Sequence, residues 1–414
     1  MNYRIIRYSR IQNRGLMDSL VSENNLYNKS FDFQLSSVCN HSIMYGDSFS
    51  RSMNSLGNEA FDFFSDFEVI QKQWAIENGV SFDQKSWKRD IIFAQISYYK
   101  ADVVYFQDTE NLKENSRKEL KKRFPFLKII ALYSGYPSRL NQMDDIDLLF
   151  VGTPRLVEQY KAHGLNPFLL YHGFDENVIS KLETSANGKK TYDFSFIGSS
   201  GYGYGLAHEA RYWALKELKQ KTDIDLWLEE KDESTRKSKS IKQISLIKYL
   251  KNNVLNPRIL DSSKNNLFNK NKFEEGSGIP LIPLKNVFNN QCYSALFGLD
   301  MYKVLSKSKI VFNMHTDAAE GVVGNMRMFE STGMGTCLLT DTGSNMADLF
   351  LKNQEVVTYS TVSEAIEKVN YLLDHDEERK KIAFAGQKRT LKDHTIKIRC
   401  QEIDQYILDH LNNV

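Results

Sequence analysis

The fold is decided by one stretch of this 414-residue chain: Gly324-Asn325-Met326-Arg327-Met328-Phe329-Glu330-Ser331-Thr332-Gly333-Met334-Gly335-Thr336-Cys337-Leu338-Leu339. It starts in a glycine-bearing loop, continues as a short helix and ends in an apolar strand. The strand-like run Ile310-Val311-Phe312-Asn313 lies just ahead of it. A strand, a loop, a helix and a second buried strand in this order are typical of a doubly wound parallel sheet.

The short helix carries side chains suited to a nucleotide. Arg327 and Glu330 are three residues apart and therefore share one helix face. A helix start that follows a glycine loop presents free N–H groups to an anion. These features predict that Asn325, Arg327 and Glu330 bind a donor, with Arg327 on its phosphates and Glu330 on its ribose hydroxyls. The alternative is a glycine-capped surface helix on which Arg327 and Glu330 pair in solvent.

The pattern Asn325-x-Arg327-x-Phe329-Glu330, followed by Gly333-x-Gly335, resembles the C-terminal domain of the spore-maturation (CgeB-type) glycosyltransferases. These are similar to the family-4 retaining glycosyltransferases. Weaker matches are Tyr45-Gly46-Asp47, His172-Gly173-Phe174-Asp175 and His394-Thr395. The resemblance implies an α/β protein of the GT-B architecture, in which two Rossmann-like, doubly wound domains face a cleft.

Apolar runs alternate with helix-like segments along both halves of the chain, which supports this architecture. We expect an acceptor-side domain over residues 1–180 and a donor-binding domain over residues 181–395, joined by a polar hinge at Asn187-Gly188-Lys189-Lys190. The resemblance implies that a last helix over residues 396–414 crosses back to the first domain. Residues 231–290 form an insertion outside the resemblance.

Composition restricts the compartment and the partners. The net charge of +2 gives no general attraction to nucleic acid. The four cysteines are scattered without zinc-site spacing, and no run approaches the ~20 apolar residues of a membrane-spanning helix. We expect a cytoplasmic, disulfide-free protein, and the resemblance implies a bacterial one. Residues 231–275 hold 11 Lys and Arg against 5 Asp and Glu. They are either a solvated insertion or a surface for peripheral membrane contact or an acidic acceptor.

A second glycine-rich loop, Gly198-Ser199-Ser200-Gly201, follows the first strand of the second domain and precedes a helix. Glycines let the backbone approach an anion, so we expect Gly198, Ser199 and Gly201 to contact donor phosphates. Arg211, farther along that helix, could reach the same phosphates. The alternatives are that the glycine-rich loop is merely flexible and that Arg211 is a surface cation.

Polar residues follow the strand that ends at Asn313. His315 is a catalytic candidate, although a packed polar role fits it equally well. In the family-4 pattern a first glutamate stands eight positions before the one matched by Glu330, and that position holds Val322 here. Glu320 or Asp317 is therefore expected to contact the donor sugar instead.

In the first domain, Asp47 follows Tyr45-Gly46 at an apparent first strand-to-helix turn, and Asp108 follows the strand Val103-Val104-Tyr105-Phe106. Each is a candidate for the base that takes the acceptor proton. The sequence does not decide between Asp47, Asp108 and His172. A retaining enzyme can instead rely on stabilising its leaving group. No Asp-x-Asp stands beside apolar strands, so neither a metal nor a cofactor is expected.

These features together predict a retaining, metal-independent glycosyltransferase of polysaccharide biosynthesis. It would move a sugar from an activated donor, most simply a nucleotide-diphosphate sugar, to a glycan or related acceptor. Three alternatives stay open: a nucleotide-sugar epimerase or phosphorylase on the same fold, a transferase with a non-nucleotide phosphosugar donor, and a non-catalytic interaction protein.

Overall fold

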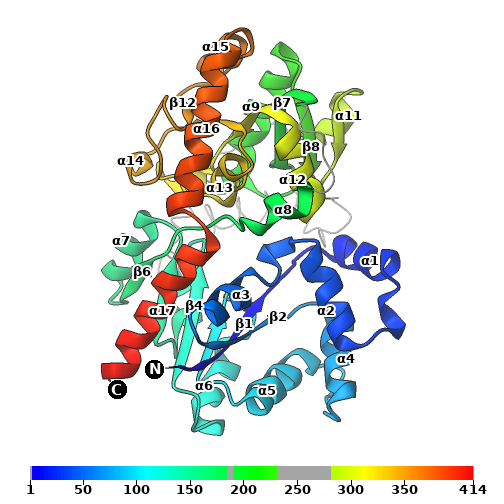
Figure 1. The fold of residues 1–414 in the computed structure, drawn as a ribbon, viewed down its shortest axis with the longest axis vertical. Coiled ribbons are helices and arrows are strands. Elements are labelled where there is room, and N and C mark those ends of the chain that lie inside the picture. The colour runs from blue at the N-terminus through cyan, green and yellow to red at the C-terminus, as the bar shows by residue number, and fades with distance from the viewer. Residues whose placement is uncertain (1, 184–189, 232–280, 414) are drawn as a thin grey trace, which may run out of the picture.

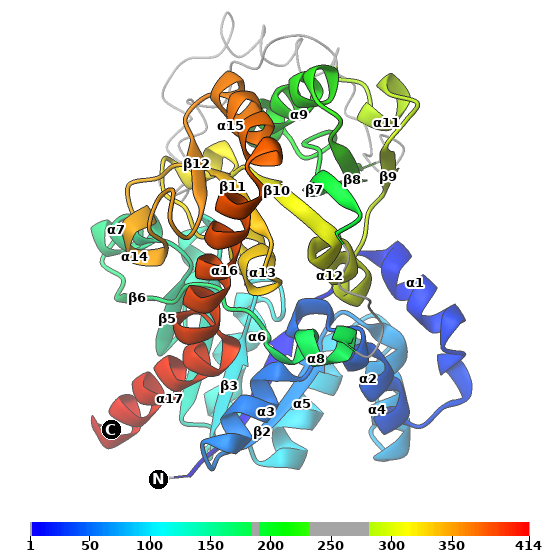
Figure 2. The same cartoon turned by 45° about the horizontal axis from the view of Figure 1, so that its top comes forward.

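The computed structural model describes residues 2–183, 190–231 and 281–413. Two α/β units, the first layer and the second layer, lie one above the other, and each consists of a parallel sheet with its covering helices. The chain ends alongside the layer in which it begins (Figures 1 and 2). The expected hinge at residues 187–190 lies almost entirely outside the described residues, as does nearly all of the basic segment 231–275.

The first layer is a six-stranded parallel sheet in the order β2-β1-β3-β4-β5-β6. Its strands are β1 (Arg4–Ser9), β2 (Glu59–Phe64), β3 (Val103–Phe106), β4 (Ile129–Ser134), β5 (Leu148–Val151) and β6 (Pro167–Leu169). Its helices are α1 (Arg14–Glu23), α2 (Phe31–Asn40), α3 (Ser48–Ser55), α4 (Glu68–Glu77), α5 (Trp87–Tyr99), α6 (Glu114–Arg123) and α7 (Pro154–Ala162).

The second layer repeats this design in the order β12-β11-β10-β7-β8-β9, again all parallel. Its strands are β7 (Tyr192–Ser199), β8 (Asp225–Glu229), β9 (Cys292–Ser294), β10 (Ser308–Asn313), β11 (Cys337–Asp341) and β12 (Val357–Tyr359). The helices of the second half are α8 (Asn177–Glu183), α9 (Glu209–Lys221), α11 (Leu284–Val287), α12 (Gly298–Lys307), α13 (Met326–Gly333), α14 (Met346–Leu349), α15 (Val362–Asp374), α16 (Asp376–Asp393) and α17 (Ile396–Asn413).

Most strands are short apolar runs because helices cover both faces of each sheet. Strands β1 and β2 depart from this pattern and escape detection in the sequence. Arg7 stands directly opposite Asp62 in the β1–β2 ladder, and their side chains form a buried ion pair with an N–O distance of 2.5 Å. Each charge interrupts an apolar run, but the pair removes the cost of burying either charge alone.

The placement of Asp47 at the first strand-to-helix turn is therefore wrong. The first strand is β1, and Asp47 instead precedes α3, which leads into β2. The short strand β9 is also absent from the sequence-based prediction.

The chain passes between the two layers twice, and the two passages are bonded to each other. The backbone N–H of Phe174 donates to His394 O at 2.8 Å, and that of Ile396 donates to Phe174 O at 2.9 Å. Beyond this point α17 packs against α3 of the first layer (Figure 1). A side chain at Gly173 would meet the Thr395 backbone at 2.9 Å, so glycine permits this close approach.

His394 lies at the second passage, with its ring packed against those of Phe329 and Phe350. Its Nδ1 faces the Arg399 guanidinium at 2.7 Å and its Nε2 lies 3.0 Å from Leu349 O. Because the guanidinium has only donors, Nδ1 must accept and Nε2–H must donate. Burial, assisted by Arg399, lowers the pKa of His394 to about 4.

We therefore expect the free energy of unfolding to fall as the pH drops from about 6.5 to about 4. In that window the unfolded chain binds a proton at this histidine and the folded chain does not. Urea denaturation at several pH values measures the slope. His394→Gln should make the slope shallower while His172 and His208, whose pKa values burial also lowers to about 4, keep the rest of it. His163→Gln at an exposed position should leave the slope unchanged. An identical slope in wild type and His394→Gln would contradict this assignment.

Candidate functional site

A cavity of about 570 Å³ lies between the two layers. Its walls follow the carboxyl ends of β1, β4 and β5 on one side and of β7, β8 and β10 on the other. Open parallel sheets bind ligands at this edge because loops and helix starts gather there. The wall of the second layer includes Gly198, Arg211, Asn325, Arg327 and Glu330, five of the residues predicted to bind the donor.

The start of α13 is fixed by two asparagines. The Asn325 side chain caps the helix by accepting from the Met328 N–H at 3.3 Å. Its amide also exchanges hydrogen bonds with the amide of Asn313, at 2.9 and 3.2 Å. Asn325 is therefore a helix cap that sets the position of the helix start, and its own polar atoms are already engaged.

His315 also holds in place the loop that leads into α13. Its Nε2 accepts from the backbone N–H groups of Gly324 and Asn325 at 3.0 and 3.2 Å. Nδ1 must then carry the proton, which it donates to Asp341 at 2.8 Å. Burial alone would raise the pKa of Asp341, but His315 and the hydrogen bonds outweigh it and lower that pKa. Both ring nitrogens are occupied, so the geometry favours a positioning role over that of a catalytic base.

Arg327 and Glu330 both line the cavity, and they pair with each other. The Arg327 Nη1 lies 2.8 Å from Glu330 Oε2, and its Nε donates to Ile197 O at 3.1 Å. Glu330 is only 5 % exposed. The Arg327–Glu330 ion pair, which the sequence suggested as the alternative to nucleotide binding, therefore exists. It lies in the cavity wall and not in solvent. Arg327 neutralises a buried carboxylate, which leaves it less free for a phosphate than the sequence suggests.

Arg211 lines the cavity with no carboxylate in ion-pair contact among the described residues; the other such cation, Lys231, lies over the Tyr204 ring. Its guanidinium donates to Ser199 Oγ at 2.9 Å and to Met314 O at 2.7 Å, both neutral acceptors. Its Nε is buried without a partner among the described residues. Ser199 thus acts by positioning Arg211. Gly201 lies outside the cavity wall; its φ of +93° and the His208 carbonyl, 2.3 Å from a would-be Cβ, explain the glycine.

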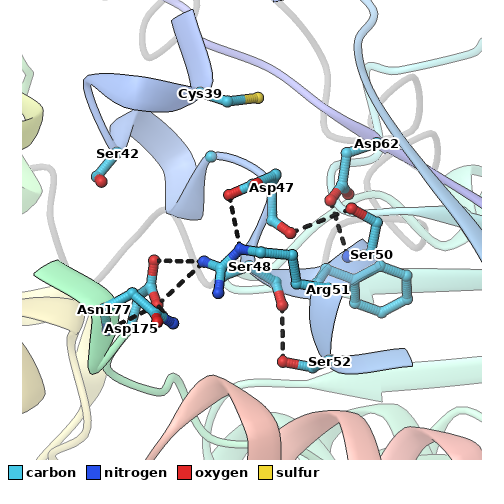
Figure 3. Close-up of polar contacts among 12 residues, drawn as sticks. Cys39, Ser42, Asp47, Ser48, Ser50, Arg51, Ser52, Asp62, Asp175 and Asn177 are labelled. Carbon is cyan, nitrogen blue, oxygen red and sulfur yellow. Dashed lines mark hydrogen bonds and ion pairs between the residues drawn. The ribbon is translucent and has the colours of Figure 1, made fainter. Parts of the chain in front are cut away.

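Asp47 and Asp108 do not reach the cavity wall. Asp47 pairs with Arg51 at 3.0 Å, and Arg51 also contacts Asp175 at 3.2 Å, so that α3 is tied to the passage between the layers (Figure 3). Asp108 accepts from Arg10 at 3.0 Å and from Gln12 at 2.7 Å. It therefore supports the loop after β1, which does line the cavity.

Glu320 forms a contact between the layers instead of lining the cavity. Its carboxylate accepts from Arg155, at the start of α7, at 2.9 Å. The neighbouring Ala318 and Ala319 do line the cavity, whereas Asp317, the other residue expected at the sugar, does not. The expected donor-sugar contact therefore has no direct support from side-chain placement.

The sequence offers His172 as one of three candidate bases, but it gives no sign of the two tyrosines beside it. His172 lies in the cavity wall between two phenols: Tyr45 Oη is 3.1 Å from its Nδ1 and Tyr133 Oη is 3.2 Å from its Nε2. Burial, with a contribution from Arg399, lowers the pKa of His172 to about 4, so its ring is neutral at pH 7. Tyr45 was quoted only as part of a motif, and no spacing rule links it to His172.

Among the described residues, no three His, Cys, Asp or Glu side chains are grouped as metal ligands would be. Within the same ranges, no helix has the apolar length that crossing a membrane requires.

Residues 283–405 match a family model described as "Glycosyl transferase-like". No curated protein matches in sequence. The spore-maturation family is not named by these findings and stays a prediction.

Solved structures match over nearly the full length. Sucrose-phosphate synthase from Thermosynechococcus elongatus has a TM-score of 0.55 at 6 % identity, with 100 % of both chains covered. HepE from Anabaena, in complex with UDP-glucose, has a TM-score of 0.54 at 10 % identity, covering 99 % of this chain and 100 % of that one. A glycosyltransferase from Rickettsia africae has a TM-score of 0.50 at 11 % identity, with both chains fully covered. Such low identities establish the fold alone. The two parallel six-stranded α/β sheets match GT-B glycosyltransferase structures, and the predicted fold class is confirmed.

Proposed function

We propose that this protein is a glycosyltransferase that binds a nucleotide-diphosphate sugar in the cavity and transfers the sugar to a glycan or related acceptor. The observation that carries the proposal is the Arg211 guanidinium. It stands in the cavity wall between two neutral acceptors, with one buried N–H group unbonded among the described residues.

An arginine keeps its charge in proteins, and a buried unpaired charge is costly. A phosphate group would supply the missing negative charge, and its geometry matches the guanidinium fork. The start of α13 offers a second contact. Asn325 caps Met328, which leaves the N–H groups of Met326 and Arg327 at the cavity end of the helix. Together, Arg211 and this helix start would suit the two phosphates of a donor.

Glu330 would accept hydrogen bonds from ribose hydroxyls; its place in the cavity wall and its ion pair with Arg327 support this role. Two of the compared structures were solved with nucleotide ligands, UDP-glucose and UDP, bound to HepE. The family model described as "Glycosyl transferase-like" covers the segment that carries Arg327 and Glu330. These findings support a nucleotide donor, with a uridine nucleotide as the first to test.

The chemistry of the wall favours leaving-group stabilisation. Within the described part of the chain, Glu229 and Glu330 are the carboxylates that line the cavity, and both come from the second layer. Asp47 and Asp108 are engaged elsewhere. We therefore extend the proposal to a retaining, metal-independent transfer. The acceptor oxygen bonds to the sugar carbon as the phosphate oxygen leaves, and the acceptor proton passes to that phosphate oxygen.

Arg211→Ala should weaken binding of UDP or the matching nucleoside diphosphate by roughly tenfold or more. A charge-assisted hydrogen bond contributes about 1.5–3 kcal/mol, and this variant removes the unpaired cation. Isothermal titration calorimetry measures the affinity. Lys221→Ala, at the exposed end of the same helix, should bind like wild type. Equal affinity of Arg211→Ala and wild type would remove the main support for the proposal.

Glu330→Gln should lower nucleoside diphosphate affinity while the protein stays folded, because a neutral amide accepts less strongly from ribose hydroxyls. The competing outcome is specific. If the main role of Glu330 is to neutralise Arg327, the substitution frees that cation and affinity rises. Calorimetry with the nucleoside diphosphate and with inorganic pyrophosphate, which lacks ribose, separates these two roles of Glu330. If Glu330 binds ribose, only the nucleoside diphosphate should lose affinity.

Sugar transfer should persist after chelation with EDTA, because cationic side chains and helix N–H groups take the role of a divalent ion at the leaving group. The assay is donor turnover before and after dialysis against the chelator. Loss of turnover that Mg²⁺ or Mn²⁺ restores would refute the metal-independent mechanism.

A further inference from the structure

One segment of the first-layer wall has an unusual backbone. Ser42, Met44, Tyr45 and Gly46 all have positive φ angles, of 53°, 47°, 71° and 53°. Left-handed backbone is unfavourable for residues with a Cβ, and it persists where surrounding contacts impose it. Ser42, Ile43, Met44 and Tyr45 all line the cavity. Strained backbone conformations of this kind cluster at functional sites.

Contacts from three directions impose this conformation. Lys181 of α8 donates to Ser42 Oγ at 2.9 Å. Arg7 of β1 donates to Gly46 O at 2.8 Å. The Leu299 N–H of α12, in the second layer, donates to His41 O at 2.8 Å. Both layers and their connection therefore hold residues 41–46, and the result is a fixed position for Tyr45.

The Tyr45 hydroxyl is one end of a chain of hydrogen bonds that runs from Tyr133 through His172 to Tyr45. A neutral imidazole has one donor and one acceptor nitrogen. Within the described ranges each phenol hydroxyl has His172 as its one hydrogen-bond partner, so the chain can run in either direction. A ligand oxygen beside Tyr45 would select the direction in which Tyr133 donates to Nε2 and His172 Nδ1–H donates to Tyr45 Oη, because this direction frees the Tyr45 O–H for the ligand.

The surroundings of Tyr45 suit a donor. Burial, followed by the nearby Glu330 carboxylate, raises the pKa of Tyr45 well above its usual value, so the phenol keeps its proton. In the second-layer wall the Tyr302 hydroxyl lies 3.5 Å from Glu330 Oε1, and Arg327 pairs with Glu330 beside them. Tyr45 thus brings a first-layer hydroxyl to the group of side chains assigned to the nucleotide.

We propose that Tyr45 donates a hydrogen bond to an oxygen of the ribose or diphosphate of the bound nucleotide, and that His172 is the positioning residue that aims it. This inference rests on the proposed function, because the ligand is the donor. It adds a nucleotide contact from the first layer, so the donor bridges both walls of the cavity. None of the residues predicted from the sequence to bind the donor supplies such a contact.

The test is calorimetry of UDP binding to the full-length protein and four variants. Tyr45→Phe should bind UDP roughly three- to tenfold more weakly, as expected for one neutral donor lost to a ligand oxygen. His172→Leu should lose a similar factor. The double variant should be no weaker than Tyr45→Phe alone, because His172 acts through Tyr45. Tyr8→Phe is the matched control: it removes a buried phenol that donates to Ile92 O at 3.3 Å, and it should bind like wild type.

Wild-type affinity in Tyr45→Phe would overturn the inference and make the chain a structural link only. Additive losses in the double variant would overturn the positioning role of His172. If His172→Leu does not fold, as judged by thermal unfolding, Tyr133→Phe replaces it and should weaken binding through the same chain. If wild type binds neither UDP nor ADP, GDP or dTDP, the proposed function fails, and this inference fails with it.

Discussion

The structure depends on the place where the chain passes twice between its two sheets. Phe174 on the first passage and residues 394–396 on the second bond to each other through their backbones, and Gly173 permits the close approach. A side chain at Gly333, in α13, would meet the Phe174 ring at 2.5 Å. The helix that carries Arg327 and Glu330 is thus packed directly against the passage. The same junction positions His172, which immediately precedes it, so it fixes groups on both walls of the cavity.

Charge pairing decides which polar groups in and around this cavity remain available. Arg7 and Asp62, Arg51 and Asp47, and Arg155 and Glu320 neutralise one another in pairs. Arg327 and Glu330 do so in the wall itself. Among the described residues the hydrogen-bond acceptors of Arg211 are neutral, and the carboxylates of Asp317 and Asp341 act on it only from beyond ion-pair distance. Its guanidinium therefore remains available to an anionic ligand. The two passages between the layers connect the two walls of the cavity, with Arg211 in one wall and Tyr45 in the other.

Much of the fold follows from local sequence. The strands of the second sheet from β10 to β12, and the helix between them, follow from apolar runs bounded by glycine loops. Strands β1 and β2 do not, because Arg7 and Asp62 compensate each other only once the two strands pair. The second-layer wall of the cavity was partly predictable for the same reason: Asn325, Arg327 and Glu330 lie at the start of one short helix or along it. Asp47, Asp108 and His315 are predicted from their position near strand ends, but Asp108 and His315 bond to distant segments, and Asp47 pairs with Arg51 on the adjoining helix. Tyr45 and His172 are 127 residues apart and meet through a backbone conformation that their residue types do not signal.

The central claim is that the cavity binds and activates a nucleotide-diphosphate sugar. The most direct measurement is the release of nucleoside diphosphate from a panel of nucleotide sugars that differ in base and sugar, followed by mass spectrometry with the purified full-length protein and no acceptor. Slow hydrolysis of at least one donor to its nucleoside diphosphate and free sugar is the predicted result. No hydrolysis and no binding of any nucleotide sugar in the panel, by a protein shown to be folded, would contradict it.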